Sequence, residues 1–193
     1  PDVLSALKPA ARNKTYMGYS DTGFLLAGLY KAGFAHLAHG PVIADLNRPG
    51  GEEAITRGLR YLFERDAAAL EPSVSNATPS AAFNMAILNN LIGTDLMPDL
   101  SGHVVMLEET SEYMYAIDRM CFHITAHAPM KRLAGIRLGR CSAIPDNDPP
   151  FGQTEEEVVK HWCAVSGIPY LGRADIGHDV ANRVVPFGRL AKV

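Results

Sequence analysis

The sequence predicts an α/β protein of two parts, each built from strands that alternate with helices. The apolar pattern changes from strand-like to helical across residues 18–21, as it does at a βα turn. The same alternation starts again after residues 66–79, a stretch rich in proline and small polar residues. We therefore expect two α/β units that are joined by a linker.

The elements of the first unit are predicted from short apolar runs bounded by turn residues. They are a helical turn at 2–7, a strand at 15–18, a helix at 23–32, a strand at 35–38 and a helix that begins after Pro49-Gly50-Gly51. The last of these helices carries Glu52 and Glu53 in its first turn, where carboxylates complement the helix dipole.

The second unit repeats this pattern with longer elements. They are a helix at 80–91, a strand at 103–107, a helix at 112–127, a strand at 133–138, a helix at 154–165 and short strands at 169–171 and 183–191. Thr154 and Glu157 have the spacing of a capping box, so the helix that follows has a defined start.

Composition excludes several classes of protein. The net charge of -3 and the scattered arginines argue against a nucleic-acid partner, which needs clustered positive charge. No apolar run is long enough to cross a membrane. Cys121, Cys141 and Cys163 are odd in number and show no CxxC spacing, so we expect three reduced thiols and a cytoplasmic location.

Two residues are the best candidates for chemistry. Glu108 comes near the end of an apolar strand, and His178 follows Gly177 after a later turn. A carboxylate and an imidazole delivered in this way are two of the three members of a hydrolytic triad. Glu109 competes with Glu108, but neighbours in a strand point to opposite sides, so only one of the two can face His178.

The nucleophile of such a triad is harder to identify. Ser20 lies at a sharp strand-to-helix turn, but Thr22 stands where a nucleophile elbow needs glycine. An N-cap role is the favoured interpretation of Ser20, and a nucleophile is the alternative. His123 and His127 have the i, i+4 spacing of a zinc pair but lack further ligands, so we assign no metal.

Several short segments, taken in order, resemble the LD-carboxypeptidase family, which includes muramoyltetrapeptide carboxypeptidases and microcin C immunity hydrolases. These segments are Gly18-Tyr-Ser-Asp21, His39-Gly-Pro41, Leu107-Glu108, Tyr115-Ala-Ile-Asp-Arg119, Gly177-His178 and Pro186-Phe-Gly188. The resemblance covers nearly the whole chain.

The resemblance implies a serine peptidase with a Ser-His-Glu triad and no metal or cofactor. Such enzymes release the terminal D-alanine of murein tetrapeptides during cytoplasmic cell-wall recycling. Glu108 would be the triad carboxylate and His178 the general base. The family also implies a homodimer, with no membrane partner.

The resemblance also defines what we expect to lie outside this chain. In the family the nucleophilic serine lies in a GxGS-like turn upstream of the segment that matches residues 18–21. We therefore expect residues 1–66 to be the later part of a flavodoxin-like parallel-sheet domain, with a linker at 67–79. Residues 80–193 would be a smaller mixed β/α domain. The isolated chain is expected to be inactive.

Two alternatives remain open at this point. The first is an amide hydrolase of the microcin C immunity type, which acts on peptidyl-nucleotides and needs a platform for the nucleoside. Trp162 is the only tryptophan, and its helix pattern places it in the core instead. The second is a non-catalytic peptide-binding relative.

Overall fold

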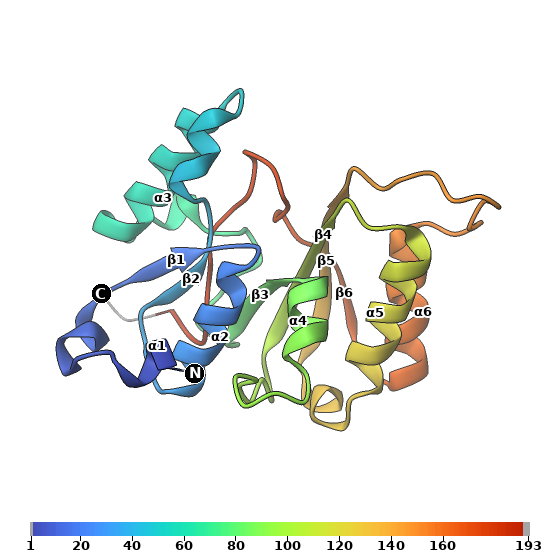
Figure 1. The fold of residues 1–193 in the computed structure, drawn as a ribbon, viewed down its shortest axis with the longest axis horizontal. Helices are drawn as coiled ribbons and strands as arrows, with labels where there is room; N and C mark the ends of the chain where they lie inside the picture. The colour runs from blue at the N-terminus through green and yellow to red at the C-terminus, as the bar shows by residue number, and fades with distance from the viewer. Residues whose placement is uncertain (1, 191–193) are drawn as a thin grey trace.

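The computed structural model describes residues 2–190, which form two sheets placed side by side with helices packed against them (Figure 1). The first sheet has the strand order β1-β2-β7, and the second has the order β3-β4-β5-β6. A mixed α/β architecture was predicted, and this prediction is confirmed.

The first sheet contains strands from both ends of the chain. β1 (Tyr16–Gly18) pairs in parallel with β2 (Leu37–His39), and β2 pairs antiparallel with β7 (Val185–Pro186). The helices of this part are α1 (Asp2–Ser5), α2 (Thr22–Lys31) and α3 (Gly51–Glu64). Because β7 joins β2, residues near the C-terminus complete the sheet begun near the N-terminus.

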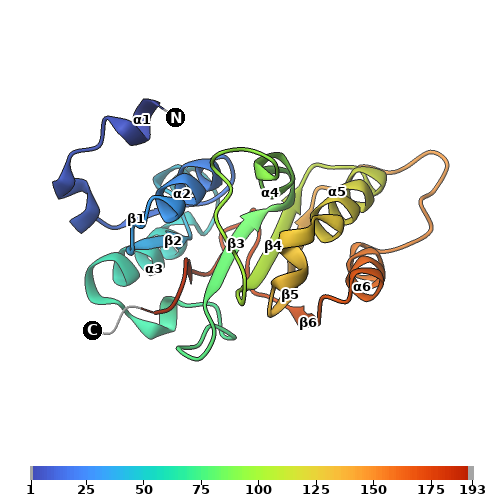
Figure 2. The same cartoon turned by 90° about the horizontal axis from the view of Figure 1, so that it is seen from below.

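The second sheet is entirely parallel. Its strands are β3 (Ser80–Asn84), β4 (Val104–Thr110), β5 (Gly135–Ser142) and β6 (Tyr170–Arg173). Its helices are α4 (Met85–Leu91), α5 (Met114–Ala126) and α6 (Glu155–Ser166). In both views α5 and α6 lie side by side against this sheet (Figure 2). The largest apolar cluster packs this sheet against these helices and extends to α2 and β2 through Leu26, Leu29 and Leu37.

Local sequence signals explain where several elements begin and end. Thr154 and Glu157 form the predicted capping box at the start of α6, and Gly167 ends that helix with a positive φ of 76°. Glu52 and Glu53 lie in the first turn of α3, as predicted.

The structure corrects three of the predicted elements. Residues 80–91 are not one helix. The five residues of β3 are buried and pair with β4, and the helix starts after them, where the Asn84 side chain accepts a hydrogen bond from the Ile87 N–H. The N-cap position of α2 is Asp21 rather than Ser20, and Ser20 has a left-handed φ of 54°. The strand expected at 183–191 is limited to β7, and Ala191 lies outside the described residues.

Candidate active site

Glu108 and His178 meet between the two sheets. Glu108 lies on β4, and His178 lies on the loop that connects β6 of the second sheet to β7 of the first. His178 Nδ1 is 3.1 Å from Glu108 Oε2. A carboxylate can only accept, so Nδ1 carries the proton in this hydrogen bond and Nε2 keeps a free lone pair. That tautomer can take a proton from a nucleophile.

An irregularity in the sheet positions Glu108. The pairing of β4 with β5 changes register between Leu107 and Glu109, and β5 has one extra residue at this point. Gly139 lies in this part of β5, and a Cβ there would be 3.1 Å from the Glu108 Cβ. Bulges of this kind redirect side chains near functional sites. The absence of a side chain at Gly139 therefore leaves room for Glu108.

The Glu108 side chain is fully buried, whereas His178 keeps 17% of its side chain exposed. Within the described residues, Glu108 Oε1 has no hydrogen-bond partner. A carboxylate placed behind an imidazole stabilises the positive charge that develops on the ring during proton transfer. The pair can therefore stabilise an imidazolium when a proton arrives.

Three residues of the first unit hold His178 from the other side. The Tyr19 ring packs edge-on against the His178 ring, with 4.8 Å between ring centroids. The Tyr19 hydroxyl donates to Asp45 Oδ1 at 2.7 Å, and burial followed by this bond raises the pKa of Tyr19. Arg48 donates to the His178 carbonyl at 2.8 Å and also contacts Asp45 at 3.3 Å. The imidazole thus lies between a buried carboxylate and a fixed aromatic edge.

Asn182 holds the turn that carries His178. Its Oδ1 accepts from Gly177 N at 3.2 Å and lies 3.1 Å from His39 Nε2. Its carbonyl accepts from Arg57 at 3.0 Å. His39 is buried in β2, and this burial lowers its pKa, so the neutral ring donates from Nε2 to Asn182. Asn182 Nδ2 is buried and has no partner within the described residues.

Arg140 fixes the residue that follows His178. Its Nε and Nη2 donate to the two oxygens of Asp179 at 2.5 and 2.9 Å, and its Nη1 donates to Asp175. Burial by itself would raise the pKa of Asp179, but the hydrogen bonds from Arg140 outweigh it and the pKa is lowered. These bidentate contacts are the stronger kind of charged hydrogen bond. The two neighbours of His178 in the chain, Gly177 and Asp179, are therefore each held by a side chain, Gly177 by Asn182 and Asp179 by Arg140.

Glu109 points to a different place. It accepts from Asn84 Nδ2 at 2.6 Å, from Ala86 N at 2.9 Å and from Thr110 N at 2.8 Å. Burial raises the pKa of Glu109, and these donors oppose that effect. Its contacts join β4 to the start of α4, which indicates a structural role.

The other candidate residues do not join the site. No hydrogen bond links the Ser20 side chain to His178 within residues 2–190. His123 Nδ1 lies 2.8 Å from Asn89 Oδ1, and no cluster of three or more His, Cys, Asp or Glu side chains in the described chain could hold a metal ion. Cys121, Cys141 and Cys163 are free thiols.

Five residues that surround His178 were not predicted from the sequence: Tyr19, His39, Asp45, Arg48 and Asn182. Tyr19 and His39 lie within the motifs at 18–21 and 39–41, which is the signal that could have found them. The contact of His39 with Asn182 spans 143 positions, so local pattern carries no trace of it.

A buried carboxylate hydrogen-bonded to an imidazole, held where two sheets meet, is the arrangement that two of the three members of a hydrolytic triad adopt. Comparison with protein-family models matches residues 81–193 to the LD-carboxypeptidase C-terminal domain. The chain belongs to the LD-carboxypeptidase family.

Individual relatives agree with this assignment. A Synechocystis protein assigned as a carboxypeptidase is 30% identical over 93% of this chain, and the chain spans 60% of its length. The structure of a muramoyltetrapeptide carboxypeptidase from Oxalobacter formigenes has a TM-score of 0.75 and 23% identity, covering 91% of this chain and 62% of that one. The microcin C7 self-immunity protein MccF, solved with glutamyl sulfamoyl guanosine, has a TM-score of 0.76 and 18% identity, covering 96% and 67%. At these identities the two structures show the fold alone.

Proposed function

We propose that this chain is part of a serine-type LD-carboxypeptidase that releases the terminal D-alanine of murein tetrapeptides. The observation that carries the proposal is the contact between His178 Nδ1 and the fully buried Glu108 Oε2, at 3.1 Å. Family membership and the muramoyltetrapeptide carboxypeptidase neighbour support the choice of substrate.

The two residues would divide the work as follows. His178 Nε2 takes the proton of a serine hydroxyl as its oxygen attacks the carbonyl of the scissile amide. Glu108 holds the imidazole in the tautomer that leaves Nε2 free and stabilises the imidazolium that forms. The imidazolium then gives its proton to the leaving amine of D-alanine. A water molecule, deprotonated by His178, then attacks the acyl-enzyme. The serine oxygen leaves and receives its proton back from His178.

We place the serine upstream of residue 1, in the part of the longer relatives that this chain does not match. The chain spans 60% of the Synechocystis relative, which leaves room for such a segment. The isolated chain would then be inactive, because triad members act as a unit. The division into residues 1–66, a linker at 67–79 and a catalytic unit at 80–193 belongs to the same proposal.

The test is release of D-alanine from a muramoyl tetrapeptide by the full-length gene product. We expect activity in the parent protein and a loss of about 10³-fold or more in His178→Ala and Glu108→Gln. Ser20→Ala is the matched control and should keep activity. Loss of activity in Ser20→Ala would make Ser20 the nucleophile and overturn the upstream placement. Full activity in His178→Ala would overturn the proposal itself.

An amide hydrolase acting on peptidyl-nucleotides is the second candidate function. It is supported by the likeness to MccF, whose structure holds glutamyl sulfamoyl guanosine. Trp162 does not favour it as the nucleoside platform, because its indole donates to Asp118 at 2.7 Å and packs against Phe122. Hydrolysis of an aminoacyl sulfamoyl nucleoside, with no release of D-alanine, would select this candidate. Absence of a GxGS-like turn from the upstream reading frame would instead favour a non-catalytic peptide-binding relative.

We also propose that the full-length protein is a cytoplasmic homodimer. The free thiols are consistent with a reducing compartment. No helix within the described residues is long and apolar enough to cross a membrane. Light scattering of the full-length protein measures its mass, and a monomer would contradict the dimer.

A further inference from the structure

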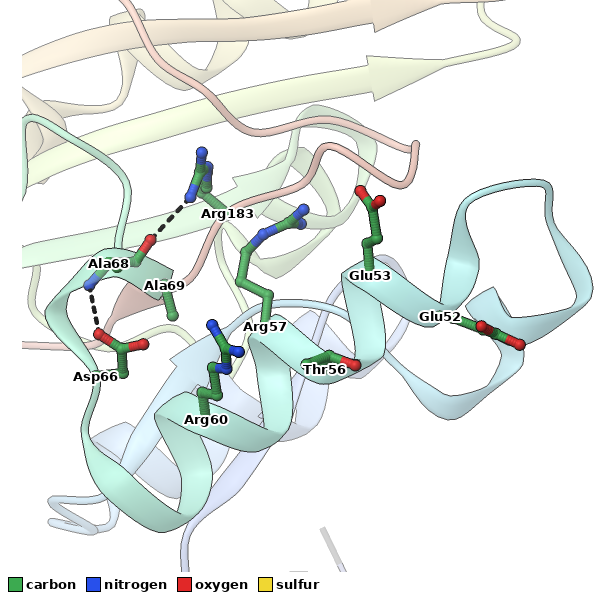
Figure 3. A pocket seen from close by; sticks show the side chains of 9 residues that line it. All are labelled: Glu52, Glu53, Thr56, Arg57, Arg60, Asp66, Ala68, Ala69 and Arg183. Carbon is green, nitrogen blue, oxygen red and sulfur yellow. Dashed lines mark hydrogen bonds between the residues drawn. The ribbon is translucent and has the colours of Figure 1, made fainter.

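A cavity of about 410 Å³ lies outside the His178–Glu108 pair, between α3 and two segments of the chain that pack beside it. One of these segments is residues 66–69 and the other contains Arg183. Arg57 and Arg60 extend into the same space from α3, one turn apart (Figure 3). Three guanidinium groups from two separate parts of the chain therefore meet at one cavity.

Two of these arginines are held in place by the backbone. Arg57 Nη1 donates to the carbonyls of Val180 and Asn182, both at 3.0 Å. Arg183 Nη1 donates to the carbonyl of Ala68 at 2.8 Å (Figure 3). Neither set of contacts uses Nη2 of the guanidinium. A guanidinium that is already fixed loses little freedom when its remaining N–H groups bind a planar anion.

Within the described residues Arg183 pairs with Asp175, with 3.4 Å between Nε and Oδ2, whereas Arg57 has no counter-ion. Arg57 forms no ion pair with any residue in the range 2–190, and carbonyls are its only acceptors. Burial lowers the pKa of Arg57, and the nearby positive charge of Arg183 lowers it further. The negative charges of Asp175 and Glu53 act in the opposite direction but do not cancel these effects. An anion placed between Arg57 and Arg183 would relieve that repulsion.

The third arginine is free to complete a site. Arg60 is exposed, and its side chain has no hydrogen bond or ion pair to the part of the chain that the structure describes. Of the acidic residues nearby, Asp66 already accepts from Ala68 N at 2.9 Å. Glu52 points away from the guanidinium groups, whereas Glu53 stands beside Arg57 (Figure 3). The cavity lining thus carries three arginines and three carboxylates, and Glu53 is the carboxylate that stands beside Arg57 (Figure 3).

We propose that this cavity binds a small zwitterionic ligand, an amino acid or short peptide. Its carboxylate would lie between Arg57, Arg60 and Arg183, and its ammonium group against Glu53. The fork of N–H groups matches the two oxygens of a carboxylate. A phosphate dianion also pairs with arginine but would be repelled by Glu53 more strongly than a single carboxylate. The cavity volume lies within the range of small-molecule sites. This site does not depend on the proposed hydrolysis.

The experiment is an NMR titration of the 193-residue protein with alanylalanine, acetate and inorganic phosphate at constant ionic strength. The Nε–Hε signals of Arg57 and Arg183 report on the cavity directly. We expect alanylalanine to shift both signals saturably and to bind more tightly than acetate or phosphate. The absence of a saturable shift would overturn the proposal, and so would tighter binding of phosphate.

Two variants assign the groups. Arg60→Gln should weaken alanylalanine binding about tenfold, which is the loss of one charged contact. Glu53→Gln should weaken alanylalanine but not acetate. Arg119→Gln, on α5 beside the other sheet, is the matched control and should bind like the parent. Unchanged binding in Arg60→Gln would refute the site. Arg57 is left intact because its substitution would also release the loop at 180–182.

Discussion

Acidification below neutral pH should destabilise the protein through His39. This ring is buried, and burial disfavours its charged, doubly protonated form. Burial lowers its pKa from the ordinary value of 6.5, and the charge of Glu108 and the bond to Asn182 oppose this effect without reversing it. Between the lowered pKa and 6.5 the unfolded chain binds more protons than the folded one. The free energy of unfolding therefore falls as pH falls through this range.

The magnitude follows from the proton uptake of the unfolded chain. With an unfolded pKa of 6.5, a ring that stays neutral in the folded state lowers the free energy of unfolding by about 1.4 kcal/mol between pH 7.5 and pH 5.5. His39→Gln removes the titrating group, while its amide can still donate to Asn182. The difference in stability between parent and variant should therefore change by up to this amount across the two pH values, the full change being reached when the folded ring stays neutral throughout.

Urea unfolding followed by circular dichroism at both pH values measures this difference. Groups that titrate in both proteins cancel. His161→Gln, at an exposed position of α6, is the control and should follow the parent. If parent and His39→Gln lose the same stability on acidification, the buried neutral state of His39 is refuted.

Three further predictions concern the packing around the site. Asn182→Ala leaves the buried Gly177 N–H without its acceptor and should cost about 3 kcal/mol, with faster amide exchange at Gly177. Gly139→Ala places a Cβ 2.8 Å from the Ile176 carbonyl and should cost about 1–3 kcal/mol, measured as a lower urea midpoint. Burial raises the pKa of Cys121, so this thiol should react with a disulfide reagent only after unfolding, and rapid reaction of the native protein would contradict its placement.

The helices and strands that the sequence predicts well are those with local signals at their ends. Thr154 and Glu157 mark the start of α6 because a capping box is formed within one turn of chain. Residues 80–84 carry no such signal. Ala81 and Ala82 favour a helix in isolation, and burial next to β4 makes the segment a strand. Tertiary contacts override local preference there.

The same distinction applies to the candidate site. Glu108 and His178 could be selected from sequence because each follows a recognisable strand or turn. The residues that hold His178 could not, since Tyr19 and Arg48 lie far from it in the sequence. Ser20 was misread for a related reason: helix capping depends on backbone angles, and its φ of 54° is not encoded by residue type.

The pairing of β7 with β2 has a consequence for how this protein is made. Ala38 finds its partner at Pro186, which is synthesised after all four strands of the second sheet. β1 and β2 are three residues each, and a pair of such short strands has little stability alone. During translation, then, the pairing of β2 with β7 waits until residue 186 has left the ribosome, whereas the four strands of the second sheet are already available. The loop that carries His178 joins β6 to β7, so His178 is made after the strand that carries Glu108 and after the residues of the first unit that contact it.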